Sequence, residues 1–164
     1  MATINKIAPC LWFDNQGEEA ARFYVSIFKN SAVGAISHYG KAGFEMHRRK
    51  EGSVMTVAFT LDGQEFLALN GGPLFKFNEA VSLMVPCETQ AEIDYYWDKL
   101  GTAGGGEDGP CGWLKDKYGL SWQIAPANMP WLARDGEGSD RAMAALMQMK
   151  KLDIAALERA YNGK

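Results

Sequence analysis

The chain has 164 residues, of which 47% are hydrophobic and 23% are charged, a balance typical of a soluble globular protein. Its 17 basic and 20 acidic residues give a net charge of -3, which excludes the basic footprint of a nucleic-acid-binding protein. No apolar run approaches the roughly 18 residues of a membrane-spanning helix, and the N-terminus lacks the apolar stretch of a secretion signal.

The cysteines indicate a reducing environment. Cys10, Cys87 and Cys111 are odd in number and widely spaced, which favours free thiols in a cytoplasmic protein over a disulfide scaffold. Cys10 and Cys87 occupy strand positions and are expected in the core. Cys111 is a small buried apolar side chain or, if a base approaches it, a nucleophile.

The first half of the chain predicts one strand, one helix and three more strands. A short apolar strand over residues 6–13 leads to a helix that Asp14 or Asn15 is expected to cap. This helix carries an apolar stripe formed by Ala20, Phe23, Tyr24, Ile27 and Phe28. Further strands are predicted over 32–39, 53–61 and 65–69. The dipeptide Asp62-Gly63 predicts a tight hairpin between the last two.

The same order of elements begins again after residue 79. A strand over 80–86 is followed by a capping box of Thr89 and Glu92. The helix behind it presents Ile93, Tyr96, Trp97 and Leu100 on one face. The stretch 111–124 then predicts a hairpin whose turn lies at Asp116 to Gly119, with a positive φ at the glycine. A module of roughly seventy residues is therefore used twice.

The last forty residues are helical in pattern. A short helix is expected over Asn128 to Arg134, Ser139 is expected to cap the next helix, and Asp153 is expected to cap the last one. These helices are packing elements or part of a dimer interface.

Two motifs carry a family resemblance. Trp12-Phe13-Asp14 leads into Glu19-Ala20-Ala21-Arg22-Phe23-Tyr24, and Asp116-Lys117-Tyr118-Gly119-Leu120-Ser121-Trp122-Gln123-Ile124 stands near the close. From about residue 4 to residue 126 the chain resembles the PhnB-like branch of the glyoxalase/bleomycin-resistance, or vicinal oxygen chelate, superfamily. Members often carry a 3-demethylubiquinone 3-methyltransferase-like label. The sequence shows no glycine-rich strand-to-helix loop of the kind that holds a methyltransferase cofactor.

The resemblance implies an α+β fold and a domain boundary. Paired βαβββ modules, over about 4–72 and 79–126, would curl mixed sheets into a cleft. They would form a domain over 1–126, and residues 127–164 would be a helical C-terminal extension.

The resemblance also identifies where a metal would bind. Metal-using members place His or Glu in the cleft from the first and last long strands of each module. The chain offers mostly apolar or amide side chains at those positions: Ile7, Pro9, Leu11, Ala68, Asn70, Ala80, Val81, Ser82 and Gln123, with Glu79 beside them. We therefore expect no metal and no other cofactor.

What remains in the expected cleft is amides, a hydroxyl and aromatic rings. Gln123, Ser121 and Asn70 are candidate hydrogen-bonding groups for a small ligand, and Trp113, Phe75 and Phe77 are candidate walls. The alternatives are that Gln123 satisfies a buried backbone group and that the aromatic rings fill the core.

The basic and histidine side chains give weaker signals. His38 and His47 are interpreted as surface or hydrogen-bonded residues rather than metal ligands. The run over 47–50 reads as a solvated loop, with contact to an anionic ligand as the alternative.

The leading functional hypothesis is a metal-free small-molecule-binding protein that forms a homodimer. The alternatives are an enzyme of the glyoxalase, dioxygenase or thiol-transfer type, and a partner-binding module whose cleft is vestigial. The fold cannot choose among them, because one fold supports many activities.

Overall fold

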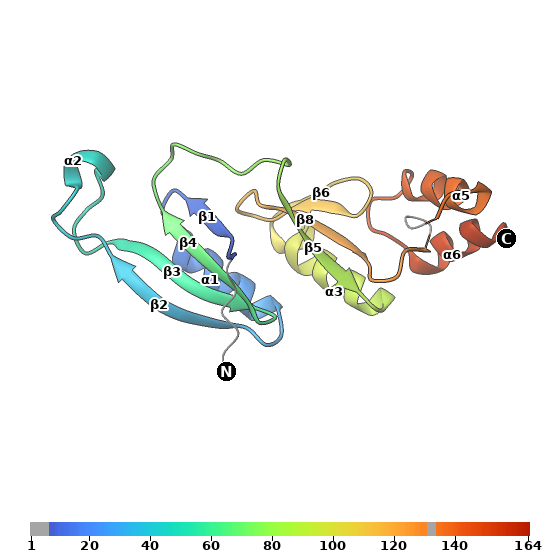
Figure 1. The fold of residues 1–164 in the computed structure, drawn as a ribbon, viewed down its shortest axis with the longest axis horizontal. Coiled ribbons are helices and arrows are strands. Elements are labelled where there is room, and N and C mark those ends of the chain that lie inside the picture. The colour runs from blue at the N-terminus through green and yellow to red at the C-terminus, as the bar shows by residue number, and fades with distance from the viewer. Residues whose placement is uncertain (1–6, 131–133) are drawn as a thin grey trace. The chain divides into compact units, whose positions relative to one another are not determined.

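A computed structural model of the protein describes residues 7–130 and 134–164. The chain divides into two compact units, Met1–Lys76 (unit 1) and Phe77–Lys164 (unit 2). Each unit contains a four-stranded sheet (Figure 1). Among the described helices, none is long and apolar enough to cross a lipid bilayer.

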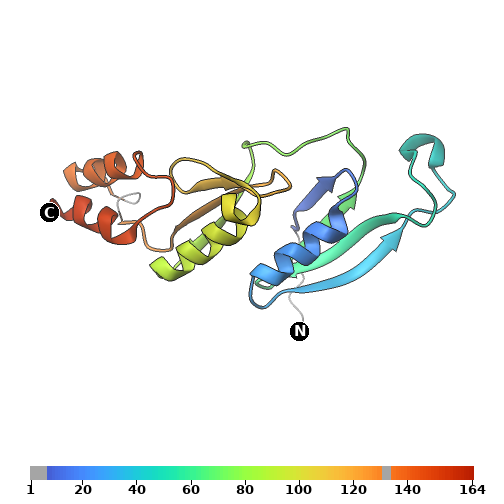
Figure 2. The same cartoon turned by 180° about the vertical axis from the view of Figure 1, so that it is seen from behind.

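Unit 1 is a βαβββ module with a one-turn helix inserted. Its elements are β1 (Cys10–Phe13), α1 (Gly17–Ile27), β2 (Ala32–His38), α2 (Phe44–His47), β3 (Val54–Leu61) and β4 (Gln64–Asn70). The strand order is β1-β4-β3-β2, with β1 parallel to β4 and the other pairs antiparallel. Helix α1 covers one face of this sheet (Figure 2). Alternate residues of β3, namely Val57, Phe59 and Leu61, are buried.

Unit 2 repeats this topology. Its elements are β5 (Ser82–Cys87), α3 (Gln90–Leu100), the 3₁₀ turn η1 (Thr102–Gly104), β6 (Glu107–Asp108), β7 (Trp113–Lys115), β8 (Ser121–Pro126), α5 (Glu137–Leu146) and α6 (Ile154–Asn162). The order β5-β8-β7-β6 matches that of unit 1, again with the first and last strands parallel. The predicted α+β class and the paired βαβββ modules are confirmed.

Both hairpins fall where the sequence predicts them. Between β3 and β4, Asp62 (φ 46°) and Gly63 (φ 78°) have the two positive φ angles of a type I′ turn. Between β7 and β8, the Gly119 N–H donates to the Asp116 carbonyl at 2.9 Å, and Gly119 has the expected positive φ of 86°.

The two main helices begin in different ways. At α3 the predicted cap is present, because Thr89 Oγ1 accepts from the Glu92 N–H at 3.2 Å. The reciprocal bond differs from a standard capping box, because Glu92 Oε2 accepts from the Glu88 N–H at 2.7 Å, one residue before Thr89. At α1 the prediction that Asp14 or Asn15 provides the cap was wrong. The capping position is Gln16, whose side chain makes no capping bond, and an acceptor from β4 takes over this role.

Strand limits differ modestly from the prediction. β1 begins only at Cys10, where the ladder with β4 starts, and Lys6 lies outside the described residues. β5 begins two residues later than expected and reaches Cys87. The polar loop expected after β2 contains α2, which Gly43 and Arg48 flank in the left-handed conformation.

The C-terminal helices pack within unit 2. A buried cluster joins β8 to the segment after it, residues 127–164, which we call the tail. Its members are Ala125, Ala142, Leu152 and Leu157. The tail backbone is also attached to the loop before β7, because the Cys111 and Gly112 N–H groups donate to the Met149 and Lys150 carbonyls, each at 2.8 Å.

The predicted caps of the tail had mixed outcomes. Asp153 caps α6 as expected, accepting from the Ala156 N–H at 2.8 Å. Ser139 does not cap α5, which begins at Glu137. Its hydroxyl instead donates to the Arg134 carbonyl at 2.6 Å. The short helix expected over 128–134 includes residues 131–133, which lie outside the described residues.

Candidate functional site

A pocket of about 170 Å³ lies in unit 2 around the start of β8. Helix α3 packs against β5, β7 and β8, and Trp122 and Ile124 of β8 are buried on that side of the sheet. Because side chains alternate along a strand, Ser121 and Gln123 point to the opposite face, as the sequence predicts. The pocket lies on this second face, which we call the open face. Its lining residues are Glu79, Glu107, Gly109, Pro110, Trp113, Leu114, Lys115 and Ser121.

Ser121 is the most unusual residue in the pocket. Its side chain is 1% exposed, and its hydroxyl oxygen has no hydrogen-bond partner among the described residues. Buried polar atoms are nearly always hydrogen-bonded, because an unpaired hydroxyl loses its water without compensation. An unpaired buried hydroxyl in the lining of a pocket is therefore a feature that a bound molecule would explain.

An ion pair stands beside this hydroxyl. Lys115 lies opposite Ser121 in the β7–β8 register, and its ammonium group pairs with the Glu79 carboxylate. The hydrogen bond to Glu79 raises the pKa of Lys115, and the same bond lowers the pKa of Glu79. Glu107, which lies opposite Lys115 on β6, raises the pKa of Lys115 further. The pocket rim therefore carries two carboxylates and one paired ammonium group.

Of the predicted site residues of unit 2, the three on β7 and β8 lie on one side of its sheet, and two of them line the pocket. Trp113 and Ser121 do so. Gln123 lies opposite Trp113 in the register, and its amide Nε2 donates to Ser82 Oγ at 2.8 Å. Gln123 thus bonds a side chain rather than the backbone group considered as its alternative partner. Phe77 is half-buried and outside the lining.

Sequence reasoning did not select Lys115 for this site. The signal was available, because Lys115 stands two residues after Trp113 on the same strand and so shares its face. Glu79 was considered only as a candidate metal ligand.

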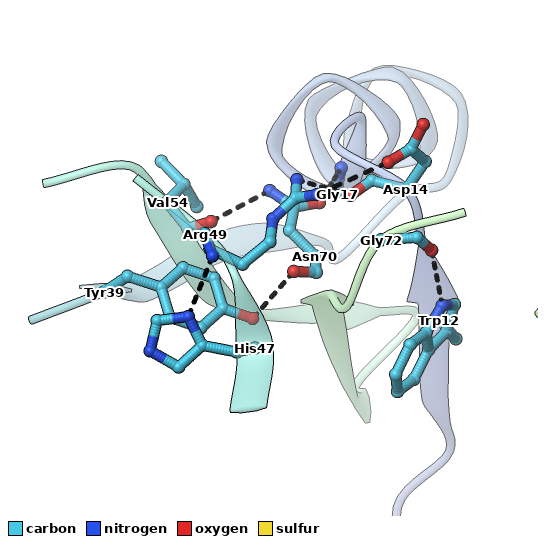
Figure 3. Close-up of polar contacts among 9 residues, drawn as sticks. All are labelled: Trp12, Asp14, Gly17, Tyr39, His47, Arg49, Val54, Asn70 and Gly72. Carbon is cyan, nitrogen blue, oxygen red and sulfur yellow. Dashed lines mark hydrogen bonds and ion pairs between the residues drawn. The ribbon is translucent and has the colours of Figure 1, made fainter. Parts of the chain in front are cut away.

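In unit 1, Asn70 forms part of a polar network at the end of β4 (Figure 3). Its Oδ1 accepts from the Gly17 N–H at 2.7 Å, and its Nδ2 donates to the Val54 carbonyl at 3.1 Å. The Tyr39 hydroxyl donates to the Asn70 carbonyl at 2.8 Å. A Cβ atom at Gly17 would lie 2.7 Å from Asn70 Oδ1, so glycine permits this close approach. These bonds account for the 5% exposed Asn70 side chain without a ligand.

Phe75 lies beside Trp12 rather than within a core. The two rings meet edge to face with centroids 4.8 Å apart, and Phe75 remains 58% exposed. The Trp12 indole N–H donates to the Gly72 carbonyl at 2.8 Å (Figure 3). Sequence reasoning used Trp12 only as part of a family motif.

The basic run folds back onto unit 1. The Arg49 guanidinium donates to the Asp14 carbonyl at 2.8 Å and lies 3.5 Å from the Asp14 carboxylate (Figure 3). The His47 ring packs against Tyr39 with centroids 4.5 Å apart, and its Nδ1 accepts from the Arg49 N–H. The loop is therefore attached to the β1–α1 connection, while Arg48 and Lys50 are exposed.

Neither a metal cluster nor a disulfide bond is formed by the described residues: no group of three His, Cys, Asp or Glu side chains converges there, and the cysteines are free. Cys87 is buried as predicted, and burial raises the pKa of its thiol to about 12. The expectation that Cys10 is a core residue was wrong. It is exposed, because it opens β1 at the edge of its sheet. Cys111 is half-buried, with a positive φ of 58°.

Comparisons with known proteins identify relatives. The sequence model of the family described as 3-demethylubiquinone-9 3-methyltransferase matches residues 5–125. A solved structure described as a putative 3-demethylubiquinone-9 3-methyltransferase, PhnB protein, from Bacillus cereus is 40% identical, covers 73% of this chain and 98% of its own, and has a TM-score of 0.61.

Two further structures are more distant. A Staphylococcus aureus protein is 28% identical over 77% of this chain and all of its own, with a TM-score of 0.34. Protein PA1353 from Pseudomonas aeruginosa is 16% identical over 75% of this chain and 98% of its own, and its TM-score of 0.59 indicates a shared fold. No curated protein matches. With the family match over most of its length and the paired modules of its fold, the chain belongs to the PhnB-like family described as 3-demethylubiquinone-9 3-methyltransferase.

Proposed function

We propose that this protein binds a small molecule in the open-face pocket of unit 2. Ser121 provides the polar contact at the base of the pocket, and Trp113 and Pro110 provide apolar wall. The observation that carries the proposal is the Ser121 hydroxyl, which is buried in the pocket lining without a partner in the described part of the chain. Ligand sites commonly combine apolar walls with a few polar groups that fix orientation.

An unpaired hydroxyl makes the proposal testable through stability alone. Ser82 lies directly opposite Ser121 in the β5–β8 register and accepts the hydrogen bond from Gln123. The same serine-to-alanine change can therefore be made at a hydroxyl that has no described partner, in Ser121, and at one that accepts a hydrogen bond, in Ser82. Ser121→Ala removes an uncompensated polar atom, and Ser82→Ala leaves the Gln123 amide without its acceptor.

The experiment compares thermal unfolding of the wild type, Ser121→Ala and Ser82→Ala proteins, alone and with a diverse library of small fragments. Without fragments, we expect Ser121→Ala to be more stable than wild type by about 1 kcal/mol and Ser82→Ala to be less stable by a similar amount. Fragments that raise the melting temperature of the wild type should have a smaller effect on Ser121→Ala.

Two results would contradict the proposal. One is a loss of stability in Ser121→Ala, which would mean that the hydroxyl already has a partner in solution. The other is a library in which no fragment perturbs the nuclear magnetic resonance signals of Trp113 and Gly109.

We also propose that the protein acts as a homodimer. Val81 (70% exposed), Met84 (57%) and Met147 (63%) are large apolar side chains at the surface of unit 2, and methionine and other apolar side chains are common in the buried core of subunit interfaces. Native mass spectrometry of freshly purified protein tests this directly. A spectrum containing only the 18.1 kDa monomer at micromolar concentration would refute it.

A further inference from the structure

We infer that the unit 2 pocket favours a molecule without negative charge that places one substituted six-membered ring in the pocket and bears one hydroxyl or carbonyl group. The inference rests on the proposed function and adds the chemical class of the ligand. It follows from the volume of the pocket, the pairing of Lys115 with Glu79, and the Ser121 hydroxyl, which has no partner among the described residues.

The volume of the pocket indicates the size of the group that it can hold. The pocket measures about 170 Å³. An apolar protein cavity of about 150 Å³ is known to accept benzene. One ring with a small substituent therefore fills the pocket.

Charge excludes small anions. Among the described residues, Lys115 is the only cationic side chain in the lining, and its ammonium group is paired with Glu79. An incoming carboxylate or phosphate would have to displace Glu79 and would also approach Glu107. Like charges brought close together repel, and the repulsion strengthens as water is excluded.

The hydroxyl defines the polar group of the ligand. Serine donates one hydrogen bond and accepts others, so Ser121 can pair with either a hydroxyl or a carbonyl on the ligand. The neighbouring walls at Pro110 and Trp113 offer apolar surface and favour a ring or a compact aliphatic group around that substituent.

Three probes of similar size separate these contributions: phenol, toluene and benzoate. Titration of the full-length protein, followed by the nuclear magnetic resonance signals of the Trp113 indole and the Gly109 amide, gives a dissociation constant for each. We expect phenol to bind about three- to tenfold more tightly than toluene, and benzoate to bind more weakly than phenol. In Ser121→Ala the difference between phenol and toluene should disappear.

A matched pair of variants tests the role of the ion pair. Glu79→Gln frees Lys115, and we expect the affinity for benzoate to rise relative to that for phenol by about two- to fivefold. Glu107→Gln removes a carboxylate from the same rim but leaves the Lys115–Glu79 pair intact, so the ratio should change less. An equal change in both variants would mean that net charge, rather than the pairing of Lys115, controls selectivity.

Failure of this inference differs from failure of the proposed function. If benzoate binds the wild type at least as tightly as phenol, or if toluene matches phenol, the inference is overturned while small-molecule binding stands. If the fragment library shifts the Trp113 and Gly109 signals but the three probes do not, the inference is likewise overturned and small-molecule binding again stands. If no compound shifts those signals, both proposals fail.

Discussion

The last strand of unit 1 ends at Asn70, opposite Phe13, and the last strand of unit 2 ends at Pro126, opposite Cys87. These are equivalent positions in the repeated topology, next to the start of the helix that follows the first strand. Asn70 bonds the first N–H of α1, whereas a proline side chain has no acceptor to offer. Helix α3 is instead capped by the adjacent Thr89.

The difference shows that one topology can stabilise its helices in two ways. In unit 1 the start of the helix depends on a strand 53 residues away, so the helix and the sheet are coupled. In unit 2 the cap is local and would form in an isolated helix. Substitutions at these two caps should therefore differ in how much stability they cost and in how many elements they affect.

The hairpins give the largest expected contrast between the units. The Asp116 carboxylate is 3% exposed and accepts from the Tyr118 and Leu120 N–H groups and from the Trp122 indole at 2.8–3.1 Å. Asp116→Ala should lower the free energy of unfolding by about 3 kcal/mol or more, measured by urea denaturation. Asp62→Ala, in the exposed turn of unit 1, serves as the control. Equal losses would show that the buried carboxylate is not a main support of unit 2.

The long-range cap comes next. Asn70→Ala leaves the Gly17 N–H and the Val54 carbonyl without side-chain partners, and we expect a loss of about 2 kcal/mol. Hydrogen exchange should accelerate in both α1 and β3, because one side chain joins them. Faster exchange in α1 alone would argue against coupling.

The local cap should matter less. Thr89→Ala removes the bond to the Glu92 N–H and should cost about 1 kcal/mol, with faster hydrogen exchange confined to the first turn of α3. Thr89→Ser, which keeps the hydroxyl, should recover most of the loss. A Thr89→Ala protein destabilised as much as Asn70→Ala would remove the distinction between the two units.

The smallest effect concerns the cysteines in the first strand of each unit. The folded state holds the pKa of Cys87 at about 12, above its ordinary value, so it keeps the proton that the unfolded chain releases near pH 9. This stabilising contribution is complete below pH 9 and is lost as the pH rises toward 12. Between pH 7 and 10 the wild type should lose about 1 kcal/mol more than Cys87→Ala.

The exposed Cys10 provides the control for that measurement. Partial burial also raises the pKa of Cys10, so Cys10→Ala should change the pH dependence in the same direction as Cys87→Ala but by less. Cys10 should react with a thiol reagent while Cys87 is protected. Rapid labelling of Cys87 at neutral pH would contradict the burial on which the pH prediction depends.

Periodicity and turn chemistry made most of the fold predictable. Alternating residues located β3, the capping box located α3, and Asp-Gly and Gly119 located the hairpins, because each is a short-range signal. The cap of α1 was not predictable in this way. Its donor and acceptor are joined only when β4 lies beside β1, and no local pattern in residues 14–17 records that contact.

The candidate site was predictable in part for the same reason. Strand alternation correctly assigned Ser121 and Gln123 to one face and Trp122 to the other. It could not show that Gln123 has a partner in Ser82 while Ser121 has none among the described residues, since this depends on side-chain geometry across three strands. The pairing of Lys115 with Glu79 likewise joins a strand to a segment that precedes the sheet.

The attachment of the tail to unit 2 has a consequence for synthesis on the ribosome. Gln90, in the first turn of α3, donates to the Leu152 carbonyl at 3.0 Å and accepts from the Ile154 N–H, and Leu152 is buried beneath Gly112. Unit 1 contains its sheet and helix within its own residues, so we expect it to fold while unit 2 is still being translated. Unit 2 must wait until the residues through Leu157 have been made, which at ordinary translation rates is a delay of roughly 4–16 s after unit 1. During that interval the apolar side chains of β5 and α3 lack the later residues against which they pack. We expect chaperones to contact these two segments.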